Sequence, residues 1–211
     1  MKLYLSSYKL GDDIEGLKKL VNKSAAKVAV IDNARDFSID LERKASSLAF
    51  DIAQIRSLGY RPEHIDLRTY FSKPGQLVQD LERFDMLWVT GGNAFILLKA
   101  MKQSGFDQVV EALIKTNKLV YAGFSAALCV ISPTLDGVEL VDDVDVVADG
   151  YNSETIWDGY SLIDFYPIVH YKSEHPESHL MDKELEYIIS KGRKYKTLRD
   201  GETLIIDSNA S

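Results

Sequence analysis

Ser125 stands where a hydroxyl group can serve as a nucleophile. Residues 119–121 before it have the aromatic and β-branched character of a buried strand, and the small and apolar residues 126–131 after it are typical of a helix packed back on the sheet. In a strand-turn-helix of this kind the serine hydroxyl is exposed at the strand's carboxyl end, and the N–H of Ala126 points toward whatever the hydroxyl attacks. A serine in this place is also a common helix N-cap, so the pattern alone leaves both roles open.

A serine nucleophile needs a base, and the chain offers four histidines: His64, His170, His175 and His179. His170 ends the apolar run 165–169 and is expected at a strand's carboxyl end, where a base can reach Ser125. A structural histidine at a sheet edge is the alternative. His64 is expected at the amino end of a short strand, on the wrong side for chemistry. The other two lie in the polar loop 173–179, whose spacing matches no compact metal-ligand set, so we expect no metal.

The acid that would orient the imidazole is ambiguous, because several carboxylates follow Ser125: Asp136, Asp142, Asp143, Asp200 and Glu202. Asp200 follows a predicted strand that ends at Leu198, whereas Asp142 is nearer to Ser125 along the chain. Carboxylates in such places are often turn residues or solvated charges. The residues alone therefore leave Asp142 and Asp200 open.

The turn Gly91-Gly92-Asn93 follows the most apolar strand of the chain, residues 86–89. Glycines at the end of a parallel strand let backbone N–H groups approach a substrate oxygen without a side chain between them. An ordinary strand-to-helix turn capped by Asn93 is the alternative. We do not expect a dinucleotide-binding site, because the turn lacks the Gly-x-Gly-x-x-Gly motif.

The elements that must position these residues alternate between strands and helices. Strands are predicted at 3–6, 27–32, 64–67, 86–89, 119–121, 167–170, 194–198 and 203–206, and helices at 12–22, 39–58, 76–83, 95–102, 106–115 and 182–191. This order predicts an α/β fold with a doubly wound, mostly parallel sheet and helices on both faces. Residues 138–147 alternate in polarity like an exposed β-ribbon, and Asp200-Gly201 is a hairpin turn signal, so we expect a β-rich C-terminal portion. Without a repeat or linker, residues 1–211 are predicted to form one domain.

Composition narrows the classes of partner. The chain has 211 residues, 45% of them hydrophobic, a net charge of −7 and a pI near 5.1. This acidity argues against nucleic acid or an anionic membrane as a partner, since both need a basic face. Cys129 is the single cysteine, which excludes an internal disulfide and fits a reducing compartment. No leader and no apolar run long enough to span a bilayer are found, so a cytoplasmic location is expected.

Three motifs in this order resemble the peptidase E family. They are Val89-Thr90-Gly91-Gly92-Asn93-Ala94-Phe95-Ile96-Leu97-Leu98, Gly123-Phe124-Ser125-Ala126-Ala127 and Pro167-Ile168-Val169-His170-Tyr171. The family consists of serine peptidases with the class I glutamine-amidotransferase-like fold, a three-layer flavodoxin-like arrangement, and also includes cyanophycinase. The resemblance covers most of the chain.

Carried over by position, the resemblance implies that Ser125 is the nucleophile and His170 the base, with backbone N–H groups of Gly92 and Ala126 as the oxyanion hole. An acid near Asp142 or at Asp200 would complete the triad, and the pattern around Asp200 fits better. The expected activity is a cytoplasmic serine peptidase that acts on short peptides, without a cofactor, as a monomer or homodimer.

The chain departs from the family pattern at Ala94, where the motif has threonine, and at Ala127, where the elbow has glycine. The peptidase that names the family cleaves dipeptides beginning with aspartate, which calls for a cation after the histidine strand, yet no arginine lies between His170 and Gly192. Candidate substrate-binding residues are Asn93, Lys172 and His175. The alternative is a binding or regulatory protein that keeps the fold without turnover.

Overall fold

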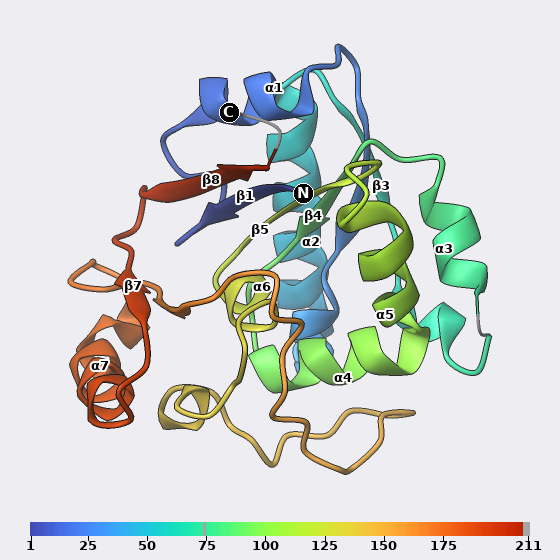
Figure 1. The fold of residues 1–211 in the computed structure, drawn as a ribbon. Coiled ribbons are helices and arrows are strands. Elements are labelled where there is room, and N and C mark those ends of the chain that lie inside the picture. The colour runs from blue at the N-terminus through green and yellow to red at the C-terminus, as the bar shows by residue number, and fades with distance from the viewer. Residues whose placement is uncertain (74, 209–211) are drawn as a thin grey trace.

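A computed structural model describes residues 1–73 and 75–208, and its centre is a six-stranded sheet (Figure 1). The strand order is β3 (Arg61–His64), β2 (Lys27–Ile31), β4 (Met86–Val89), β5 (Val120–Phe124), β1 (Lys2–Ser6) and β8 (Thr203–Asp207). The first five strands are parallel and β8 runs antiparallel to β1. The carboxyl ends of β1, β5, β4 and β2 therefore meet at one edge, which is where ligands collect in such sheets.

Helices cover both faces of this sheet, as predicted. One face packs against α1 (Ile14–Val21) and α2 (Leu41–Ser57), and the other against α3 (Gln76–Leu81), α4 (Ala94–Ser104), α5 (Phe106–Val109) and α6 (Ala126–Cys129). The strands β4 and β5 are buried along their whole length, which explains why they lack polar alternation. Among the described residues, no helix has the length and apolar character needed to cross a membrane.

The C-terminal portion is less regular than predicted. A small parallel pair, β6 (Tyr166–Ile168) and β7 (Tyr195–Thr197), stands apart from the main sheet and packs beside α7 (Met181–Ser190). Asp200-Gly201 does form a turn, but the predicted hairpin is wrong because β7 pairs with β6 whereas β8 pairs with β1. Figure 1 shows β7 and α7 beside the sheet, beyond the β8 side.

The predicted β-ribbon at 138–147 is also wrong. The segment has one short 3₁₀ turn, Val138–Leu140, and then runs irregularly along the protein. Its alternation has another cause: Val138 is buried and Val141, Val144 and Val146 pack partly against the core, while the polar residues between them face outward or contact α4. Half-burial of an irregular segment thus imitates the period of a strand.

Candidate active site

Ser125 lies at the sharp turn between β5 and α6, with φ 53° and ψ −114°. Non-glycine residues rarely adopt a positive φ, and such strain persists only where the surrounding structure enforces it. Here the N–H of Ser125 donates to the carbonyl of Ser6 on β1 at 3.3 Å. The serine side chain makes no cap bond to α6, so the N-cap alternative does not describe this residue.

Two glycines make the close packing around this turn possible. A Cβ on Gly123 would lie 2.4 Å from the carbonyl oxygen of Val89 and 2.6 Å from Cβ of Ala127, while a Cβ on Gly91 would lie 2.9 Å from Cβ of Ser125. Gly123 therefore leaves the space that the methyl group of Ala127 fills. The departure from glycine at position 127 is accommodated in the core, where Ala127 is fully buried.

His170 lies two residues beyond β6 and contacts Ser125 directly. Its Nε2 is 3.2 Å from Oγ of Ser125, and its Nδ1 is 2.7 Å from Oδ1 of Asp200. Because a carboxylate only accepts hydrogen bonds, Nδ1 carries the proton and Nε2 is free to accept from the serine hydroxyl. His170 itself has φ 55°, so Ser125 and His170 both occupy backbone positions that non-glycine residues rarely adopt.

The structure brings Asp200, and not Asp142, to the imidazole. Asp200 follows β7 in the turn before β8, and its backbone N–H donates to Oγ of Ser173 at 2.8 Å. Asp142 lies elsewhere, where its Oδ2 accepts from the N–H of Ala94 at 2.7 Å at the start of α4. Burial raises the pKa of Asp142 to about 7, and nearby Glu177 acts in the same direction.

Sequence reasoning missed Ser7, which connects His170 and Asp200. Its hydroxyl accepts from the backbone N–H of His170 at 2.8 Å and lies 3.1 Å from Oδ1 of Asp200. Ser7 directly follows β1, the neighbour of β5. A polar residue at the carboxyl end of an apolar strand is the feature of the sequence that could have identified it.

The imidazole of His170 is also held by aromatic contacts. The ring of His175 stacks on it with centroids 3.7 Å apart at an interplanar angle of 10°, and Tyr8 packs edge-on against both rings. Burial lowers the pKa of His170; the charge of His175 adds to this, while the hydrogen bond to Asp200 opposes it. A neutral imidazole is the form that can accept a proton from Ser125.

The glycine turn after β4 lies against Ser125. Gly92 has φ 145°, and a Cβ there would lie 2.5 Å from the carbonyl oxygen of Ala34. Within residues 1–73 and 75–208, the N–H groups of Gly92 and Ala126 make no hydrogen bond, so both remain available to an oxygen atom. Preorganised donors of this kind stabilise a developing negative charge.

The three predicted substrate-binding residues lie in different surroundings. Asn93 is buried and engaged within the protein: its side chain accepts from the N–H of Ile96 at 3.0 Å and donates to the carbonyl of Asp143 at 2.8 Å. This is the helix-cap alternative rather than a substrate contact. Lys172 and His175 both line a cavity of about 500 Å³ that also contains Asp200.

One group of side chains in the described ranges has the composition of a metal site. Nitrogen or oxygen atoms of His170, His175 and Glu177 lie within 4.8 Å of one another. The two imidazoles are stacked nearly parallel, so their in-plane lone pairs do not converge on one point. The arrangement therefore fits a stacked histidine pair better than a metal centre.

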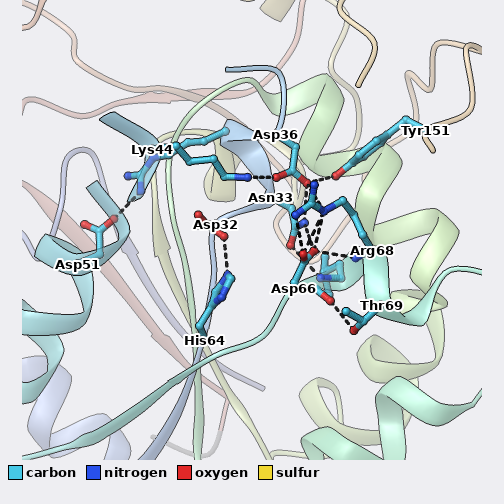
Figure 2. A network of polar contacts seen from close by, with 12 residues as sticks. Asp32, Asn33, Asp36, Lys44, Asp51, His64, Asp66, Arg68, Thr69 and Tyr151 are labelled. Atoms are coloured by element: carbon cyan, nitrogen blue, oxygen red, sulfur yellow. Dashed lines mark hydrogen bonds and ion pairs between the residues drawn. The ribbon is translucent and has the colours of Figure 1, made fainter. Parts of the chain in front are cut away.

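A network of polar side chains lies at the ends of β2 and β3 (Figure 2). His64 is the last residue of β3, not the first residue of a strand as predicted, and its Nε2 lies 2.7 Å from Oδ1 of Asp32. The side chain of Asn33 donates to Asp36 and Asp66 and fixes a short 3₁₀ turn, Asn33–Arg35. The carbonyl of Ala34 in that turn accepts from the N–H of Asn93 at 2.9 Å.

A mostly parallel sheet with a serine elbow at its carboxyl edge, and a histidine–aspartate pair in contact with that serine, is an arrangement that serine hydrolases use. Residues 12–210 match the sequence profile of Peptidase family S51. The chain therefore belongs to peptidase family S51, and the predicted resemblance to peptidase E is confirmed.

Individual relatives are distant. The chain is 31% identical over 119 residues to an uncharacterized peptidase of Listeria monocytogenes, covering 56% of this chain and 55% of the relative. It is 24% identical over 156 residues to an uncharacterized peptidase of Pasteurella multocida, covering 67% and 72%. The chain thus spans about half the length of the Listeria relative that it matches.

Solved structures share the fold. A "Putative Peptidase E Protein" from Listeria monocytogenes superposes with a TM-score of 0.70 at 23% identity, covering 97% of both chains. A peptidase from an acI-B1 Actinobacterium superposes with a TM-score of 0.57 at 17% identity, covering 87% of this chain and 74% of that one. The predicted fold class, a doubly wound and mostly parallel α/β sheet, is confirmed.

Proposed function

We propose that this protein is a serine peptidase of short peptides that works through an acyl-enzyme on Ser125. One observation carries the proposal: the strained Ser125, the buried His170 and the partly exposed Asp200 form a continuous hydrogen-bonded chain, with contacts of 3.2 Å and 2.7 Å. Such a chain at a nucleophile elbow is the recurring arrangement for acyl transfer.

In the proposed reaction, Ser125 Oγ attacks the scissile carbonyl while Nε2 of His170 takes its proton. Asp200 keeps the imidazole in the required tautomer and stabilises the imidazolium that forms. The N–H groups of Gly92 and Ala126 bind the oxyanion. His170 then protonates the leaving amine. In the second half of the reaction, water gives a proton to His170 and attacks the acyl-enzyme, and His170 returns the proton to Ser125 as the acyl group leaves.

The test is labelling with a fluorophosphonate probe combined with hydrolysis of a dipeptide library. The proposal expects labelling and turnover in the wild type and loss of both in Ser125→Ala. Ser57→Ala, at an exposed hydroxyl near the end of α2, is the matched control and should label normally. Folded protein that does not label, or labelling that persists in Ser125→Ala, would contradict the assignment and favour a binding protein without turnover.

A further inference from the structure

A cavity of about 300 Å³ adjoins the candidate active site on the α2 face of the sheet. Three of the residues that line it are neighbours of His170, of Ser125 and of the glycine turn, respectively. The ring of Tyr8 packs edge-on against His170, Phe124 directly precedes Ser125, and Arg35 follows Ala34, whose carbonyl lies against Gly92. A substrate group one or two residues away from the scissile bond can therefore reach this cavity.

The lining of this cavity is cationic: Lys9, Arg35 and Arg43 face one carboxylate, that of Asp51. Neither Lys9 nor Arg43 has an ion-pair partner in the described part of the chain. The ammonium group of Lys9 instead lies 3.8 Å from the ring centroid of Phe50. The net positive charge of the cavity is therefore available to an anion.

Arg35 is the best-placed of these cations. Its Nη1 donates to Oδ2 of the buried Asp51 at 2.7 Å, which holds the guanidinium in place. Its remaining side-chain N–H groups make no hydrogen bond within residues 1–73 and 75–208, although the side chain is only 18% exposed. An oriented guanidinium with free donors is suited to a planar carboxylate.

Neighbouring cations outside this cavity are already paired. Lys44 binds Asp36, and Arg68 binds Asp66 at 2.6 Å and also lies near Asp36 (Figure 2). The network thus neutralises its own cations, whereas in the cavity Arg35 is paired with Asp51 and, within the described residues, Lys9 and Arg43 have no ion-pair partner.

The cavity continues into a second one of about 560 Å³, which shares Arg35, Arg43 and Ser47. The second cavity adds the exposed apolar side chains of Phe37 and Ile39. Cationic and apolar groups thus lie side by side, as a terminal amino acid with a free carboxylate and an apolar side chain requires.

We propose that Arg35, assisted by Lys9 and Arg43, binds the free C-terminal carboxylate of a short peptide whose scissile bond lies at Ser125. This inference rests on the proposed peptidase function and specifies its substrate. One extended residue spans at most about 3.5 Å, so in a dipeptide or tripeptide the terminal carboxylate stays close to the scissile carbonyl. Longer or C-terminally blocked peptides lack a carboxylate at this place.

The experiment compares dipeptides with a free carboxylate against the same dipeptides as C-terminal amides. We expect the wild type to favour the acids, and Lys9→Met and Arg43→Met each to lower kcat/KM for the acids about tenfold, through KM, as for the loss of one charge-assisted contact. Hydrolysis of the amides should not change. Arg35→Met is made together with Asp51→Asn, because the single variant would strand a buried carboxylate. Arg83→Met, at a surface ion pair with Glu63, is the matched control.

Equal hydrolysis of acids and amides by the wild type, or an equal loss for both in the variants, overturns the proposal. The proposal is also overturned if the variants lose a preference for substrates with an acidic side chain and keep the preference for a free C-terminal carboxylate. If Ser125 is not labelled and the protein hydrolyses no dipeptide, the proposed peptidase function is refuted. The carboxylate site in the cavity is then tested by itself, by calorimetric measurement of the binding of the same acids and amides. Binding of acids that the Lys9 and Arg43 variants weaken supports the carboxylate site, and the absence of any difference refutes it.

Discussion

We expect the wild-type protein to lose stability at alkaline pH because Glu184 ionises, and replacement of Glu184 by glutamine should remove that loss. Glu184 is 4% exposed on α7 and accepts a hydrogen bond from the hydroxyl of Tyr166 at 2.8 Å. Burial raises the pKa of Glu184 from 4.5 to about 8, and the nearby carboxylates of Asp142, Glu139 and Glu177 also raise it. The folded protein therefore holds this proton more tightly than the unfolded chain does.

The sign of the effect follows from proton linkage. The stabilisation is fully present below pH 4.5 and is lost as pH rises through about 8. The slope is about 1.4 kcal/mol per pH unit from pH 6 up to the folded pKa of about 8 and flattens above it, so the change from pH 6 to pH 9 amounts to about 3 kcal/mol. For a protein of this length that corresponds to roughly 6–12 °C in Tm.

Thermal unfolding of wild type and Glu184→Gln at pH 6 and pH 9 measures this difference. Glutamine keeps an acceptor for Tyr166, so the variant should lose much less stability between the two pH values. Glu186→Gln, exposed on the same helix, is the control and should follow the wild type. Identical drops in Tm for wild type and Glu184→Gln would refute the assignment of this titration to Glu184.

Three other outcomes are expected. Asp200→Asn should lower kcat by about 10³–10⁴-fold because the imidazole loses the partner that sets its tautomer, whereas Asp142→Asn should stay within about tenfold; comparable losses would reverse the choice of acid. The acid limb of kcat/KM should lie below pH 6.5, because burial lowers the pKa of His170, and a limb above that value would argue against this base. Gly123→Ala should lower the free energy of unfolding in urea by about 1–3 kcal/mol, because its Cβ would lie 2.4 Å from the carbonyl of Val89, and an unchanged midpoint would contradict that packing.

The fold could be predicted because its main strands carry a strong local signal. Strands β4 and β5 are buried throughout, and each ends at a turn with glycine or serine, so sequence alone located the carboxyl edge of the sheet. The position of Ser125 followed from the same rule. His170 was also expected at a strand's carboxyl end, but its strand, β6, belongs to the separate two-stranded pair. The rule places residues at an edge, whereas the 3.2 Å contact between them depends on packing that no local pattern encodes.

The errors arise where long-range contacts decide the structure. The edge strand β3 is polar and mostly exposed, so the search for apolar residues placed the strand at 64–67, three residues too far along the chain. His64 was therefore assigned to the start of the strand instead of its end. The strands on either side of Asp200 looked like hairpin partners, but their pairing is with β6 and β1. Ser7 was missed because its role needs His170 and Asp200 beside it. A single domain, a monomer or homodimer, and a cytoplasmic location remain predictions.

The candidate site is assembled from parts of the chain that are synthesised far apart. Its contacts join residues 45 positions apart for Ser125 and His170, 30 for His170 and Asp200, and 193 for Ser7 and Asp200. Contacts of such long sequence separation slow folding, because the entropy of closing the intervening loop is lost before the contact forms. A growing chain that has reached only α7 holds the serine and the histidine without the aspartate, and without β8 to close against β1. The proposed triad can therefore be complete only after Asp200 has been made and has folded beside His170, so any shorter chain lacks the acid that orients the imidazole.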